Sequence, residues 1–211
     1  MITRHGKPGT RLALVSGAIL ILLAAMAIDT KAVKIGSAAD VQSDIFSPAT
    51  YGRSEFPKVQ AAIESRAVDA AALAALLSKD QAAAEKQYGV AAGGGPEMPV
   101  KFTGQAGKQD FGVYDVTVTG VPDTIHVSVQ TGPAINGTDL RDATDLITFG
   151  QFRNQIDYQN AGSALNTEMK HEVLSKIDAG DLTGKTISVV GVFELNDPGN
   201  WVVTPVKLDL R

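Results

Sequence analysis

The sequence predicts an α+β protein in which helices come first and strands follow. Apolar residues recur at helical spacing up to about residue 92, and beyond that point they alternate with a period of two. The change falls at Gly93–Pro96, where three glycines and a proline cannot continue a helix. We therefore expect residues 1–28 to be a tail and apolar segment, residues 29–92 a lead-in and helical region, and residues 93–211 a β-rich domain.

The first part of the chain has the pattern of a membrane-targeting segment. Leu12 to Ile28 form a run of 17 residues without a charge. Three basic and no acidic side chains precede this run, namely Arg4, Lys7 and Arg11. A helix needs about 17–25 such residues to cross a bilayer, whereas the apolar part of a cleaved signal has about 7–15. We expect a membrane helix with a cytoplasmic tail, although Ala25–Ala27 also offers a cleavage site after Ala27.

Composition and charge exclude several classes of protein. The 211 residues include no cysteine, so the sequence offers no disulfide, thiolate metal ligand, cysteine nucleophile or lipid-modified cysteine. The net charge is −4 overall, and residues 29–211 carry 16 basic and 23 acidic side chains, a net −7. A body this acidic repels phosphate backbones, and we expect no nucleic-acid partner.

The Ala-rich region predicts three consecutive helical segments. The first begins near Ser54 with Pro57 in its first turn, because proline is tolerated there. Asp69 and Asp80 are expected to cap the second and third segments, and Gly89 is expected to end the third in a left-handed conformation. A core-facing stripe is expected at Leu73, Leu76 and Leu77.

The β-rich domain shows a strand order with one inserted helix. Alternating apolar residues predict strands near residues 100–103, 114–119, 124–130, 187–193 and 206–211. Turns are expected at Gly107–Asp110 and Gly120–Asp123. A helix is expected over residues 158–179, with Gly180 as its terminator. Five strands with a helix between the third and fourth predict an OB-like antiparallel β-barrel.

Motifs typical of cofactor or metal sites are weak. Ala179–Thr186 matches a relaxed phosphate-loop pattern, but a helix precedes it and a strand follows, the reverse of the order that such a loop needs. Three acids recur at every third position, Asp139, Asp142 and Asp145; we interpret them as loop caps and partners of Arg141 instead of ligands for a cation. His126 and His171 are expected at the surface. We therefore expect no cofactor, no metal and no histidine-based catalytic site.

The long polar stretch from Thr131 to Asp157 is the candidate functional region. Loops of this length are usually functional or disordered, and apolar residues along this one argue against disorder. Its candidate ligand-binding residues are Asn136, Arg141, Asp142, Asn154 and Gln155. The stretch could line a cleft or form a buried network that closes the barrel, and the sequence does not separate these two possibilities.

The segment GPAINGTDLRDATDLITFGQFRNQIDYQNAGSALN, from Gly132 to Asn166, resembles an uncharacterised bacterial family, domain of unknown function 2291, described as predicted periplasmic lipoproteins. The likeness extends to the Ala-rich helices and to the last two strands. It adds Asn166 to the candidate residues, and it implies an envelope role, because members are often encoded beside sugar-uptake ABC transporters. The missing cysteine departs from the lipoprotein label, so an apolar helix would have to anchor the chain.

Together these points predict a membrane-tethered periplasmic accessory or binding protein. Its expected location is the cytoplasmic membrane, as a single-pass protein with the C-terminal domain in the periplasm. Its expected partners are the membrane and either a small polar ligand or components of a sugar ABC transporter. The alternatives are an envelope hydrolase that cleaves a glycan with Asp142 and a second carboxylate, and a structural assembly subunit.

Overall fold

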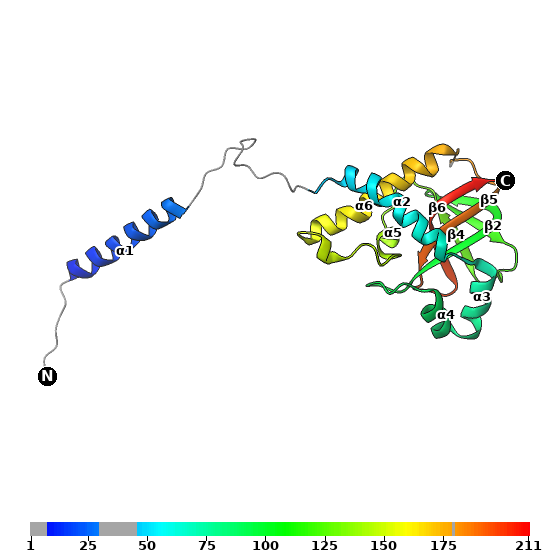
Figure 1. Cartoon of the computed structure of the whole chain (residues 1–211), viewed down its shortest axis with the longest axis horizontal. Coiled ribbons are helices and arrows are strands. Elements are labelled where there is room, and N and C mark those ends of the chain that lie inside the picture. The colour runs from blue at the N-terminus through cyan, green and yellow to red at the C-terminus, as the bar shows by residue number, and fades with distance from the viewer. Residues whose placement is uncertain (1–7, 30–45, 179) are drawn as a thin grey trace. The chain divides into compact units, whose positions relative to one another are not determined.

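The computed structural model describes residues 8–29, 46–178 and 180–211. The chain divides into two compact units, residues 1–45 and 46–211 (Figure 1). The elements in chain order are α1 Pro8–Asp29, α2 Pro48–Arg66, β1 Val68–Asp69, α3 Ala70–Lys79, α4 Gln81–Tyr88, β2 Glu97–Asp110, β3 Val113–Val118, β4 His126–Gln130, α5 Asp139–Asp142, the 3-10 turn η1 Phe149–Gln151, α6 Gln155–Glu172, the 3-10 turn η2 Leu174–Lys176, β5 Thr186–Glu194 and β6 Asn200–Leu210.

The first unit contains helix α1, which covers the predicted apolar run. Its aliphatic side chains are open to the surroundings, with Leu20 67% exposed and Ile21 73% exposed. Among the residues whose placement is described, no helix combines the length and apolar character needed to cross a bilayer. The membrane helix over residues 12–28 therefore stays a prediction.

The second unit is built on a six-stranded mixed sheet. Strand β2 pairs with β3 on one side and with β5 on the other, and the pairings β2–β3–β4–β6–β5 return to β2. The short β1 adds a parallel pairing to β2. Strands β4 and β6 also run parallel, whereas the prediction had only antiparallel strands. The parallel pair is possible because α5, α6 and β5 lie between β4 and β6 in the chain, so no tight hairpin joins the two strands.

The first β-hairpin turns later than the sequence predicts. Residues Gly107–Asp110 continue β2, with an irregularity in its pairing between Ala106 and Gln109. The chain reverses at Phe111 and Gly112, whose φ angles are +47° and +85°. Two successive positive φ angles match the right-handed twist of a hairpin, and this explains the turn at Phe111 and Gly112, which the sequence pattern did not single out.

The helical caps agree with the prediction, but the boundaries differ. Asp69 accepts hydrogen bonds from the first amides of α3, and Asp80 accepts one from Ala83 in α4. Helix α2 begins at Pro48, so Pro57 lies inside it and not in its first turn. Gly89 ends α4 with a φ of −74°, an extended conformation and not the expected left-handed one. Pro48 suits the first position of α2, because an N–H group at the start of a helix has no partner within the helix.

Helix α6 also starts and ends earlier than residues 158–179. The Asn154 side chain accepts a hydrogen bond from the Asp157 amide at 2.8 Å and so begins the helix at Gln155. The helix ends at Glu172, and the chain continues as the 3-10 turn η2 instead of reaching Gly180. The predicted apolar stripe holds across this change, because Leu165, Met169 and Val173 are buried and Ile177 packs against the core.

Helices α2 and α6 lie beside one another against the sheet, and α3 and α4 form a separate pair (Figure 1). The backbones of α2 and α6 approach closely at Gly52, where a Cβ atom would lie 2.6 Å from the Ala164 carbonyl oxygen. Within the core, the rings of Phe193 and Trp201 stack with centroids 4.8 Å apart. The close approach at Gly52 packs α2 directly against α6.

Candidate functional site

The polar stretch before α6 folds around Arg141, which lies on α5 with its side chain only 8% exposed. The guanidinium donates to Asp142 through Nε at 2.7 Å and through Nη2 at 2.8 Å, a two-pronged contact. Its Nη1 donates to the Tyr158 carbonyl at 3.2 Å, and its Cζ lies 3.8 Å from the centroid of the Tyr158 ring. All three nitrogens therefore have partners within the protein.

Asp142 is the acceptor at the centre of this network. Besides Arg141, the hydroxyl groups of Thr138 and Tyr158 donate to its carboxylate at 2.7 and 3.3 Å. Burial acts to raise the pKa of Asp142, but the hydrogen bonds from Arg141 and Thr138 outweigh burial and hold the pKa below its ordinary value. A general acid needs a raised pKa, so this geometry does not suit Asp142 to the role of general acid in glycan hydrolysis.

The other candidate residues lie in separate environments. Asn166 is 4% exposed, and its Nδ2 donates to the carbonyls of Gly137 at 2.8 Å and Ile135 at 3.3 Å. Asn154 caps α6, while Asn136 and Gln155 are exposed. The structure therefore brings together Arg141 and Asp142, anchors the preceding loop through Asn166, and leaves the other three at the surface.

A second buried polar cluster is centred on Glu97, an acid that the sequence did not indicate. Glu97 begins β2, is 2% exposed, and lies directly across from Glu194 in the sheet register. No hydrogen-bond partner reaches its buried Oε2 within the described part of the chain. Burial, then the charges of Asp139 and Glu194, raise the pKa of Glu97 to about 9. The side chain of Glu97 is consequently neutral at pH 7.

Asp139 joins this cluster from α5. The Thr204 hydroxyl donates to its Oδ2 at 2.7 Å, and Gln130 donates to the Thr204 oxygen at 3.0 Å. Burial raises the pKa of Asp139 even though the hydrogen bond from Thr204 opposes the rise. The predicted role of Asp139 as a loop cap missed this contact, because Thr204 lies 65 residues further along the chain.

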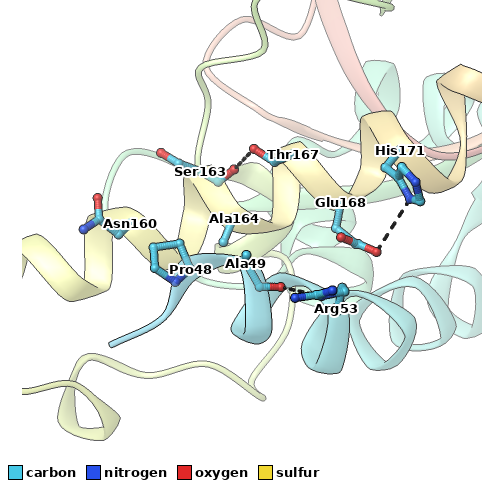
Figure 2. A pocket seen from close by; sticks show the side chains of 9 residues that line it. All are labelled: Pro48, Ala49, Arg53, Asn160, Ser163, Ala164, Thr167, Glu168 and His171. Carbon is cyan, nitrogen blue, oxygen red and sulfur yellow. Dashed lines mark hydrogen bonds and ion pairs between the residues drawn. The ribbon is translucent and has the colours of Figure 1, made fainter. Parts of the chain in front are cut away.

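One hollow of the folded unit lies between α2 and α6, and Figure 2 shows its lining. Its volume is about 530 Å³. Three residues of α2 and six of α6 form its walls: Pro48, Ala49, Arg53, Asn160, Ser163, Ala164, Thr167, Glu168 and His171. A volume of this size suits a small molecule, since ligand pockets have about 300–1,000 Å³. None of the predicted site residues lines this cleft.

Charged groups gather at one end of the cleft (Figure 2). The Arg53 side chain is held by a hydrogen bond from its Nε to the Ala49 carbonyl at 3.1 Å. His171 is 74% exposed and lies 3.9 Å from the Glu168 carboxylate and 3.0 Å from that of Glu172. Ligand atoms of these last three residues lie within 4.8 Å of one another, and Glu172 is also paired with Lys176 at 2.9 Å. Mutual ion pairing accounts for this group without a bound metal ion.

Comparisons with known proteins agree with the architecture. A model of the family DUF2291, described as a predicted periplasmic lipoprotein, matches residues 18–209. A solved structure of an OB-fold protein from Thermotoga maritima is similar with a TM-score of 0.62 and 20% identity, over 80% of this chain and 100% of that one. At this identity the likeness shows the fold alone. No curated protein is significantly similar to the chain.

Proposed function

Because the chain belongs to the DUF2291 family of predicted periplasmic lipoproteins, we propose that it is a membrane-tethered accessory protein of the cell envelope that binds a small ligand. In the folded unit, the strand pairings that return to β2 are those expected of a closed OB-type barrel. The finer points are the tether, the ligand and the partner, and each rests on its own observation.

The exposed aliphatic surface of α1 carries the proposal. Large apolar side chains between Val15 and Met26 are exposed, and the 17 residues from Leu12 to Ile28 contain no charge. Exposure of such a surface to water is unfavourable, at about 25 cal/mol for each Å² of apolar area. With no cysteine in the sequence to accept a lipid, the apolar helix is the group available for anchoring. The basic residues before it favour a cytoplasmic tail and a periplasmic folded unit.

The absence of cysteine makes this topology directly testable, because every introduced thiol is unique. We would place a single cysteine at Ser65, exposed on α2, or at Thr10, before the apolar run. In intact spheroplasts, a membrane-impermeant thiol reagent should label Ser65→Cys, whereas Thr10→Cys should react only after lysis. Labelling of both variants before lysis, or recovery of the chain in the soluble fraction, would refute the tether.

The cleft between α2 and α6 is the proposed ligand site. Its middle is formed by Pro48, Ala49 and Ala164, whereas Arg53 and Glu168 lie at one end. An apolar floor with a few polar groups is the usual composition of a small-molecule pocket. We expect a ligand with a compact apolar body and a polar or charged end.

A cleft-filling variant tests this site. We would screen panels of amino acids, monosaccharides and short carboxylic acids for an increase in melting temperature of the full chain. Thr167→Trp should abolish the increase caused by any compound that binds in the cleft, while Ser65→Trp, exposed outside the cleft, should leave the increase intact. An effect that persists in Thr167→Trp would place the ligand elsewhere.

Components of a sugar-uptake ABC transporter are the proposed protein partners, an expectation that comes from the resemblance to the family. A photo-reactive group at exposed Gln155 tests this partnership in intact cells. Cross-linking to transporter subunits would support the proposal. Cross-links exclusively to other envelope proteins would refute the proposed transporter partnership and identify those proteins as the partners.

A further inference from the structure

A group of aromatic side chains forms a distinct surface on the folded unit. We call it the aromatic face, and its rings are those of Phe46, Tyr51, Phe149, Phe152 and Tyr158; Leu146 and Ile156 lie near them in the sequence. Neighbouring ring centroids lie 5.2–5.6 Å apart. Leu146, Phe149 and Ile156 are 48%, 51% and 71% exposed. Apolar groups that gather in this way mark an interaction surface more often than isolated apolar residues do.

Contacts with Arg141 and Asp142 hold Tyr158, one ring of this face, in place. The guanidinium of Arg141 lies against the Tyr158 ring, and the Tyr158 hydroxyl donates to Asp142 at 3.3 Å. Tyr158 in turn contacts Phe149 and Phe152 edge-on or tilted. The Arg141–Asp142 network thus positions the aromatic face, and a rigid face loses little conformational entropy when it binds.

The aromatic face lies where the tether reaches the folded unit. Phe46, one of its rings, is the first residue of that unit. Only residues 30–45 separate it from Asp29 at the end of α1. Sixteen residues extend at most about 55 Å, so a bilayer that holds α1 always lies within reach of the face.

We propose that the aromatic face rests on the periplasmic surface of the lipid bilayer, with Phe149 and Ile156 inserted at the headgroup boundary. This inference rests on the proposed tether and adds a second, peripheral contact to it. Tyrosine and other aromatic side chains favour this boundary, because their rings are apolar and their polar groups remain hydrated. The acidic body, −7 over residues 29–211, makes attraction to anionic lipids unfavourable, so the contact should form on neutral lipids and resist salt.

A polarity-sensitive fluorophore tests this contact in the full chain. We would attach nitrobenzoxadiazole to the single thiol of Ile156→Cys and reconstitute one copy per phosphatidylcholine nanodisc. The matched control is Phe111→Cys, at a position that is 93% exposed on the β2–β3 hairpin. The label at Ile156 should emit at shorter wavelength and several-fold more strongly than the control, and nitroxide lipids should quench it. Phe149→Ser in the same background should reduce both effects.

The outcomes separate the face from the tether. Aqueous emission at Ile156 from a chain that stays with the nanodisc would overturn the lipid contact and leave the tether standing. A chain that separates from the nanodisc would overturn both. A blue shift that needs two copies per nanodisc would identify a second chain as the occupant and overturn the contact with lipid.

Discussion

Two polar clusters lie close together in the folded unit, and they shift the pKa values of their carboxyl groups in opposite directions. The Arg141–Asp142 cluster pairs a cation with an anion and gives the carboxylate donors on every side. The acidic cluster brings together the carboxyl groups of Glu97, Asp139 and Glu194, with the Thr204 hydroxyl as donor to Asp139. The pKa of Asp142 is lowered, whereas those of Glu97 and Asp139 are raised.

The difference shows that burial does not settle the charge of a side chain. Both clusters lose hydration, and the pKa of the carboxyl group falls where a paired cation donates to it and rises where the charged neighbours are other carboxyl groups. We infer that the first cluster stabilises the fold at neutral pH and that the second opposes it. Each of the following predictions tests this contrast, and unfolding by urea can be followed through Trp201, the single, fully buried tryptophan.

Removal of Arg141 should have the largest effect. Arg141→Ala leaves the carboxylate of Asp142 buried without its cation, which typically costs 3–5 kcal/mol (about 4 kcal/mol is expected) in the free energy of unfolding. The apolar double variant Arg141→Met with Asp142→Leu should lose much less than the single variant. Arg53→Ala is the exposed control, with a change within about 0.5 kcal/mol. Unchanged stability of Arg141→Ala, with loss of ligand or partner binding, would instead make Arg141 a recognition residue.

Glu97→Gln should have the opposite sign. The raised pKa means that the folded state holds a proton that the unfolded state releases, so stability from this group is complete below the unfolded pKa and is lost as pH rises toward 9. At pH 7 the variant should therefore be more stable by up to about 3 kcal/mol, and the gain should disappear near pH 4. Glu64→Gln, at an exposed position of α2, should show no such pH dependence. A gain that does not change with pH would contradict the raised pKa.

Asn166→Ala tests a neutral anchor of the same loop. The substitution leaves the carbonyl oxygens of Ile135 and Gly137 without their donor, for an expected loss of about 1–3 kcal/mol. This loss should be smaller than that of Arg141→Ala, because no charge is left unpaired. Asn196→Ala, at an exposed position, serves as the control. Equal losses for Asn166→Ala and Arg141→Ala would show that hydrogen bonding, and not charge pairing, holds the loop.

Asn154→Ala should have the smallest effect. It removes the cap of α6 at an exposed position, where loss of a capping side chain costs about 1 kcal/mol. Gln155→Ala, one residue later, should change the free energy of unfolding by less than about 0.5 kcal/mol. A fall of several kcal/mol in the free energy of unfolding of either variant would mean that these exposed residues contribute to the stability of the core.

Local patterns predicted much of the fold for physical reasons that act over a few residues. The caps at Asp69 and Asp80 depend on amides two or three positions away, and both are confirmed. The alternation that buries Tyr114, Val116 and Val118 reflects the pleat of a single strand. The family follows from the sequence in the same way, because its model matches most of the chain.

The candidate site was less predictable, because its contacts join distant segments. Pro48 and Ala49 line the cleft opposite α6, although more than one hundred residues separate them from that helix in the sequence. Helical periodicity marks the buried face of α6 but does not indicate which helix will pack beside it. Arg141 and Asp142 were correctly identified as a pair, yet whether their pair is open to a ligand depended on Tyr158 and Thr138.

Short-range chemistry in the chain thus sets where helices begin, which face of each strand is apolar, and that the first segment is apolar and preceded by basic residues. Long-range packing chose the rest: the register that sets Glu97 against Glu194, the hydrogen bond from Thr204 to Asp139, and the hollow between α2 and α6. Periodicity and capping are properties of neighbouring residues, whereas the hydration and pKa of a carboxyl group depend on whatever the fold brings against it.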